Sequence, residues 1–152
     1  MKIWIGSDHA GYDLKSKIVE RLEDRVVYEV IDVGPFDDER VDYPEYGYGV
    51  VKGVKESIES GEESYGILIC GTGIGMSLVA NGVEGLRGAL CYSEYVAEMA
   101  RRHNDSRVLC MGARVVEEEV CLGMVDVFLR TAFDGGRHAD RLKMLETLVR
   151  EK

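Results

Sequence analysis

The sequence predicts an α/β fold, namely a three-layer α/β/α sandwich around a five-stranded parallel, Rossmann-like sheet. Short apolar runs alternate five times with amphipathic stretches along the 152 residues, which is the pattern of repeated strand–helix units. The runs are continuously apolar, as is typical of strands that helices cover on both faces. No linker, low-complexity tract or repeat interrupts this pattern, so we expect one domain over residues 1–152.

The first half of the chain contains two such units. Strands are expected at residues 2–5 and 28–33, and Gly34-Pro35 ends the second one. The helix after the first strand is predicted by apolar residues four apart, namely Ala10, Leu14, Ile18 and Leu22. After a polar loop over residues 37–43, a second helical stripe follows, made of Tyr46, Val50, Val54 and Ile58. It ends at Ser60-Gly61, a common helix stop.

The second half of the chain contains three further strands, at residues 65–70, 88–91 and 108–111. Helices are expected after them at residues 75–81, 94–102 and 117–133, and a last helix at residues 138–149. The glutamates at 117–119 suit the positive end of a helix dipole. The last helix is predicted to turn four apolar side chains inward, those of Leu142, Leu145, Leu148 and Val149.

Charge and cysteine content exclude several classes of function. With 19 basic and 28 acidic residues the formal net charge is −9, which argues against a nucleic-acid or anionic-membrane partner. No basic leader and no apolar run of about 20 residues is present, so no membrane partner is expected. Four cysteines, none in CxxC spacing, indicate reduced thiols and a cytoplasmic location.

The clearest functional signal is the turn Gly71-Thr72-Gly73-Ile74-Gly75, which follows a buried strand and opens a helix. Glycines let successive N–H groups converge, and a helix N-terminus adds positive charge, so the turn suits an anion or an oxyanion. A plain turn would need only one glycine. The turn also partly resembles a dinucleotide fingerprint with Glu94 as a ribose ligand, but Asp8 would repel a pyrophosphate. A nucleotide site therefore remains an open alternative.

Polar side chains gather where the predicted strands end, and ligands of such sheets bind there. Cys70 directly precedes the glycine turn, where N–H groups and a helix N-terminus favour a reactive thiolate over a buried, inert thiol. His9 and His103 stand in polar clusters and are candidate acid–base groups. Arg137 and Arg141 are four residues apart on one helix face, as in a fork for phosphate, although a salt-bridged surface would look the same.

The chain resembles the RpiB-type ribose-5-phosphate isomerase family, which also contains galactose-6-phosphate isomerase subunits. The resemblance covers nearly the whole chain and rests on six motifs in one order: GSDHAG at 6–11, DYP at 42–44, ICGTGIGMS at 69–77, RxHND at 101–105, GARVV at 112–116 and GGRHxxR at 135–141. Some relatives use a carboxylate elsewhere as the base. Cys70 places this sequence with the cysteine-containing members.

The resemblance implies an aldose–ketose isomerase that interconverts ribose 5-phosphate and ribulose 5-phosphate in the pentose phosphate pathway. Cys70 would move the proton between C1 and C2 through an enediolate, with help from Thr72, and His103 would open the sugar ring. The enediolate oxygen would bind the N–H groups of Gly71, Gly73, Ile74 and Gly75. The remaining substrate-binding residues implied are Asp8, His9, Tyr43, Asn104, Arg114, Arg137 and Arg141.

No metal ion and no cofactor is expected for this chemistry. The partner implied, besides the sugar phosphate, is a second copy of the chain, in a homodimer or a dimer of dimers with its active sites between subunits. His103, Asn104, Arg137 and Arg141 would then serve the partner's Cys70. Three alternatives stay open: a 6-phosphohexose isomerase for allose or galactose 6-phosphate, a non-catalytic sugar-phosphate or nucleotide-binding module, and a subunit that needs a different partner chain.

Overall fold

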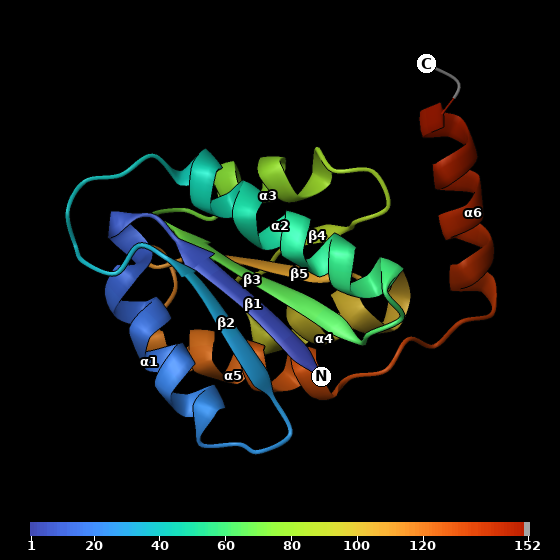
Figure 1. Ribbon diagram of the computed structural model, residues 1–152. Helices are drawn as coiled ribbons and strands as arrows, with labels where there is room; N and C mark the ends of the chain where they lie inside the picture. Colours follow the sequence, from blue (N-terminus) through green and yellow to red (C-terminus); the bar gives the residue numbers. More distant parts are fainter. Residues whose placement is uncertain (151–152) are drawn as a thin grey trace.

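Five parallel strands form one sheet in the computed structural model, which describes residues 1–150 (Figure 1). The strands are β1 (Lys2–Ser7), β2 (Glu29–Gly34), β3 (Ser64–Cys70), β4 (Gly88–Leu90) and β5 (Val108–Gly112). Their order across the sheet is β2-β1-β3-β5-β4, and each neighbouring pair is parallel. The predicted α/β class and the parallel sheet are confirmed.

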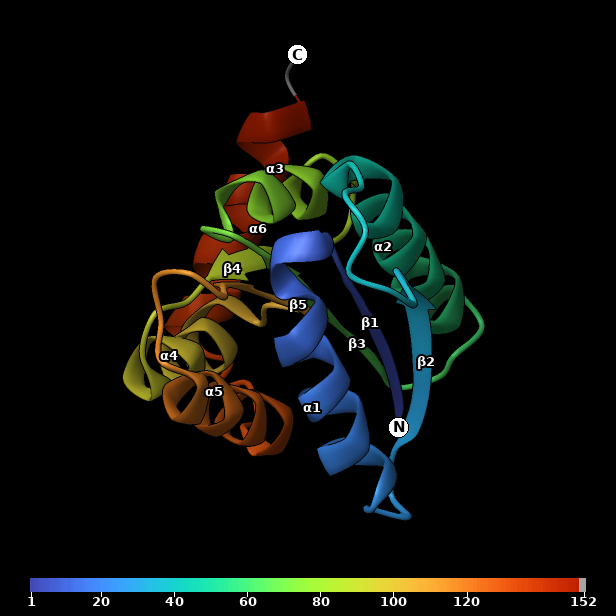
Figure 2. The same ribbon diagram turned by 90° about the vertical axis from the view of Figure 1, so that its left-hand side faces the viewer.

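Helices cover both faces of this sheet, so the predicted three layers are also confirmed (Figure 2). One face packs against α1 (Tyr12–Glu23), α4 (Glu94–Asn104) and α5 (Glu118–Arg130), and the other packs against α2 (Tyr43–Glu59) and α3 (Ile74–Asn81). A separate apolar cluster fills each interface. Every residue of β3 is buried, which explains why this strand reads as one continuous apolar run.

The helix boundaries follow from local signals with small shifts. In α1 the predicted stripe is buried at Leu14, Ile18 and Leu22, whereas Ala10 lies in a short 3-10 turn, η1 (His9–Gly11). Helix α2 begins at Tyr43, three residues before the predicted stripe, with a proline in its first turn, where a missing N–H costs nothing.

The helix predicted over residues 117–133 is too long, because α5 ends at Arg130 and Thr131 is extended (φ −88°, ψ 126°). Two hydrogen bonds hold this segment along α4 instead. The carbonyl of Thr131 accepts from Nε of Arg101 at 3.3 Å, and the N–H of Asp134 donates to the carbonyl of Arg102 at 3.0 Å. Contacts between elements therefore end the helix where its own periodicity would continue it.

The last helix, α6 (Arg137–Arg150), stands apart from the three layers (Figure 1). The prediction that its apolar side chains point inward is wrong for the single chain. Leu145 is 51% exposed, Leu148 is 63% exposed and Val149 is 62% exposed, and only Leu142 is half-buried. The segment over residues 131–136 carries α6 past α4, so most of its apolar face finds no partner among residues 1–150.

Within residues 1–150, none of the helices is both long enough and apolar enough to cross a bilayer.

Candidate active site

The carboxyl ends of β1 and β3 lie where the strand order reverses, which is where ligands bind in sheets of this kind. These two strands are neighbours, but η1 and α1 leave toward one face while α3 leaves toward the other. The backbone N–H of Asp8 donates to the carbonyl of Ile69 at 3.1 Å and joins the two strand ends. Asp8, His9 and Cys70 are therefore brought to one place.

The glycine turn after β3 needs its glycines for space as well as for conformation. Gly73 has φ +80°, and a Cβ there would lie 2.6 Å from Leu90 and 2.8 Å from the backbone of Met111. A Cβ on Gly75 would lie 2.7 Å from the ring of Tyr43. The turn is thus pressed between β5 and Tyr43, and it leads into the N-terminus of α3, where backbone N–H groups favour a bound anion.

Cys70 is the last residue of β3 and its side chain is held against this turn. The N–H of Gly73 donates to Sγ of Cys70 at 3.1 Å, and the N–H of Ile74 donates to Oγ1 of Thr72 at 3.3 Å. The sulfur of Cys70 thus lies beside the backbone N–H groups at the start of α3. The geometry can therefore place a base or nucleophile beside an oxyanion site.

The other three cysteines lie in apolar surroundings. Burial raises the pKa of Cys91 to about 12 and that of Cys121 to about 11. Burial likewise raises the pKa of the Cys110 thiol, and the nearby sulfurs of Cys91 and Cys70 add to the effect. These three thiols stay protonated at neutral pH and serve as core side chains.

Three further predicted residues lie at the same edge of the sheet. Oδ1 of Asp8 accepts from the N–H groups of Ala10 at 2.9 Å and Gly11 at 3.2 Å, so the carboxylate caps η1. Nδ1 of His9 lies 3.2 Å from the carbonyl oxygen of Val41, which ties the ring to the loop before α2. The side chain of Arg114 lies over Gly71, whose carbonyl accepts from the backbone N–H of Arg114 at 3.0 Å.

The other predicted residues lie at the opposite edge. Cys70 is paired with Gly112 at the carboxyl end of β5, whereas His103 precedes Val108 at its amino end by five residues. The strand between them spans roughly 13 Å or more at about 3.3 Å per residue. Asn104, Arg137 and Arg141 share this opposite edge with His103, at the end of α4 and the start of α6. One chain thus holds two separate groups of predicted site residues.

In the second group, His103 and His138 stack with ring centroids 4.1 Å apart and planes 7° from parallel. With Asp134 they bring three potential metal-ligand atoms within 4.8 Å of one another, among the residues that the structure describes. The nitrogen lone pairs of two such rings lie in nearly parallel planes, whereas a tetrahedral zinc ion needs ligands that converge. The stacked arrangement therefore does not favour a tetrahedral metal site.

A model of the family described as Ribose/Galactose Isomerase matches residues 3–145, which is most of the chain. The chain belongs to this family. Its sequence is 42% identical over 151 residues to ribose-5-phosphate isomerase B of Escherichia coli, covering 99% of this chain and 98% of the relative. The family assignment confirms the resemblance that the six motifs predicted.

Solved structures agree with this family assignment. Ribose-5-phosphate isomerase B of Clostridium thermocellum superposes with a TM-score of 0.90 at 47% identity, over 99% of each chain. The enzyme of Mycoplasma genitalium with bound ribulose-5-phosphate superposes with a TM-score of 0.91 at 38% identity, over 99% of this chain and 97% of that one. These family members share the fold of the whole described chain.

The sequence analysis assigned no role to Arg101. In the structure, this side chain holds the end of α4, where His103 of the second group lies. Arg101 is 3% exposed and donates to the carboxylate of Asp105 at 2.8 Å, the carbonyl of Ser106 at 2.7 Å and the hydroxyl of Tyr65 at 3.1 Å. These bonds fix the turn that ends α4 just after His103. A signal was present, because Arg101 continues the inward spacing of Ala97 and Ala100 on α4.

Proposed function

We propose that this chain is an aldose–ketose isomerase that interconverts ribose 5-phosphate and ribulose 5-phosphate, a step of the pentose phosphate pathway. The observation that carries the proposal is the thiol of Cys70, held 3.1 Å from the N–H of Gly73 at the start of α3. Membership of the ribose/galactose isomerase family supports it, as does the relative of 38% identity whose structure holds ribulose-5-phosphate.

In the proposed reaction, the thiolate of Cys70 removes the proton on C2 of the open-chain aldose. The electron pair forms the C1–C2 double bond, and the negative charge moves to O1, giving an enediolate. The N–H groups of Gly71 and Gly75 would stabilise that oxygen, and Thr72 would assist. Those of Gly73 and Ile74 donate to Sγ of Cys70 and Oγ1 of Thr72 in this structure, so they would join the oxyanion site by turning from these acceptors to the substrate. The thiol then returns the proton to C1, and the proton of the C2 hydroxyl passes to O1, so C2 becomes the carbonyl without any oxidant or reductant.

The aldose must first open its furanose ring, and this step falls to His103 in our proposal. An imidazole can remove the proton from the C1 hydroxyl and protonate the ring oxygen near neutral pH. Asp8 would bind the ring hydroxyls, and Asn104 would add a ligand. The phosphate would lie between His9, Arg114, Arg137 and Arg141, with Tyr43 beside it, because guanidinium groups bind phosphate through paired hydrogen bonds.

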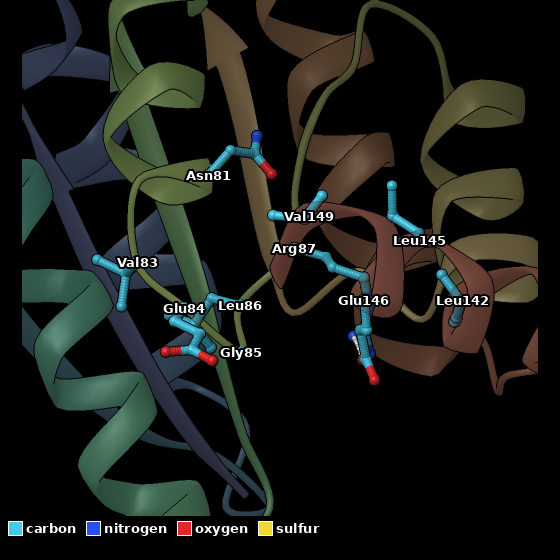
Figure 3. Close-up of a pocket in the computed structure, with 10 residues that line it drawn as sticks. All are labelled: Asn81, Val83, Glu84, Gly85, Leu86, Arg87, Leu142, Leu145, Glu146 and Val149. Carbon is cyan, nitrogen blue, oxygen red and sulfur yellow. Dashed lines mark hydrogen bonds and ion pairs between the residues drawn. The ribbon is translucent and has the colours of Figure 1, made fainter. Parts of the chain in front are cut away.

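These roles require a homodimer, because His103 and Cys70 lie at opposite edges of the sheet in one chain. The exposed apolar side chains of α6 support a second copy as the partner. Between α6 and the segment from α3 to β4 lies a groove of about 560 Å³, lined on one side by Leu142, Leu145 and Val149 (Figure 3). A second chain that filled this groove would bury the apolar face that a single chain leaves exposed.

Leu145→Glu is expected to weaken dimer association by at least about 100-fold, because an unpaired carboxylate would be buried in an apolar contact. Analytical ultracentrifugation across a dilution series would measure the association, and turnover should fall with it. Thr147→Glu is the matched control, since it adds the same charge to an exposed position of α6 outside the groove. A Leu145→Glu variant that stays dimeric would reject the groove as the interface.

The proposed activity is tested by offering the protein a panel of aldose phosphates in the presence of EDTA and measuring ketose formation. Ribose 5-phosphate is expected to be converted without added metal. Faster conversion of allose or galactose 6-phosphate would reassign the substrate within the same reaction. Binding of these sugars without any turnover would replace the isomerase by a binding module, and turnover that requires a metal would reject the mechanism.

A further inference from the structure

The stacked pair of His103 and His138 gives His138 a task that neither the family assignment nor the proposed mechanism contains. His103 is the second-last residue of α4, and His138 is the second residue of α6. Their ring centroids lie 4.1 Å apart with planes 7° from parallel, and His138 is only 9% exposed. The side chain of His138 therefore packs against His103 and has little contact with bulk solvent.

A clamp between two segments holds the pair face to face. Nε of Arg102 donates to both carboxylate oxygens of Asp134, at 3.1 Å and 3.3 Å, and the backbone N–H of Asp134 donates to the carbonyl of Arg102. Gly135 and Gly136 follow with φ +65° and +55°, a left-handed conformation that turns the chain into α6. The start of α6 is thereby fixed against the end of α4.

The charges around His138 favour its neutral form. Burial lowers the pKa of His138, and the positive fields of His103, Arg137 and Arg141 lower it further, while only Asp134 acts in the opposite direction. The carboxylate of Asp134 is itself paired with Arg102 on α4, which also pairs with Glu98. At neutral pH the ring of His138 is therefore an uncharged flat surface on which His103 rests.

We propose that His138 is a positioning residue for ring opening, which holds the imidazole of His103 in one orientation toward the sugar by stacking against it. This inference rests on the proposed function, because it assigns a task only if His103 opens the ring. Proton transfer is sensitive to geometry, since a misplacement of about 1 Å can cost up to about 100-fold in rate.

The chemistry of the substrate separates this role from a general structural one. Ribose 5-phosphate is a ring that must open before Cys70 can act. Ribulose 5-phosphate cannot close a furanose ring, because its C5 oxygen carries the phosphate. Exchange of a C1 proton of ribulose 5-phosphate with deuterated solvent therefore needs Cys70 but not ring opening.

His138→Ala is expected to lower kcat for ribose 5-phosphate by about 10- to 100-fold, while deuterium exchange into ribulose 5-phosphate stays within about twofold of wild type. His138→Phe should restore most of kcat, because a phenyl ring can still stack on His103. Steady-state kinetics and proton NMR of the exchange reaction would measure both, and thermal unfolding would show that the variants are folded.

Three results would overturn the inference while leaving the proposed function intact. They are an unchanged kcat in His138→Ala, equal losses in turnover and exchange, and a His138→Phe variant no better than His138→Ala. The failure of the proposed function would look different, because the wild-type protein would then show neither turnover of ribose 5-phosphate nor exchange into ribulose 5-phosphate.

Discussion

Cys70→Ala is expected to lower the turnover of ribose 5-phosphate by about 10²- to 10⁴-fold, the usual contribution of a positioned general base. The methyl side chain cannot accept the C2 proton, and the other groups near Cys70 do not replace it. Thr72 carries a neutral hydroxyl that already accepts from the N–H of Ile74, and Asp8 caps η1. Binding should survive, because the oxyanion and phosphate ligands are unaltered.

Two measurements check this expectation. Deuterium exchange into ribulose 5-phosphate should vanish together with turnover, while calorimetry should detect substrate binding close to that of wild type. Cys110→Ala is the matched control, since Cys110 is a fully buried thiol on the neighbouring strand β5. It should cost some stability through a small cavity but keep most of the activity. A Cys70→Ala variant that retains near wild-type turnover would show that another group is the base.

The layers of this fold could be predicted from the sequence, because local patterns of apolar residues determine them. The run Tyr65–Cys70 is continuously apolar and becomes a strand buried on both faces, and the stripe of Leu14, Ile18 and Leu22 becomes the buried face of α1. The glycine turn after β3 could also be predicted from the sequence. Gly73 and Gly75 stand where a side chain would collide with Met111 or Tyr43, so their spacing reflects a real constraint.

The path of the chain after α5 could not be predicted in the same way, because long-range contacts determine it. Periodicity continues a helix through Phe133, but the hydrogen bond from Arg101 to Thr131 holds the segment extended. Periodicity also gives α6 an apolar face without saying which surface that face covers. The contact between His103 and His138 depends on this path, so no spacing between the two residues could predict it.

The acidic composition is compatible with an anionic substrate only if the positive charges are local. In one chain the proposed phosphate ligands are split, with His9 and Arg114 at the carboxyl edge of the sheet and Arg137 and Arg141 at the other side. Neither half combines the thiol of Cys70 with the paired guanidinium groups. In a twofold-symmetric dimer, the group around Cys70 of each chain can lie beside the group around His103 of the other chain. The dimer then contains two complete sites.

Heterodimers of two inactive variants are therefore expected to regain activity. A dimer that carries Cys70→Ala in one chain and His103→Asn in the other has one site with both defects and one site with both residues intact. If each site takes Cys70 from one chain and His103 from its partner, this dimer should reach about half of the wild-type rate, since one of two equivalent sites works. If the two chains carry different affinity tags, the heterodimer can be separated from the two homodimers and assayed directly.

The reciprocal heterodimer makes the test decisive. Here one chain carries both Cys70→Ala and His103→Asn, and its partner is wild type. Shared sites place one defect in each of the two sites, so this dimer should be as inactive as the single-variant homodimers. Sites built within one chain predict the reverse pattern, in which the doubly substituted dimer keeps about half of the activity and the other dimer keeps none. The total number of substitutions is the same in both dimers, so a difference in rate reports only which chain supplies each residue.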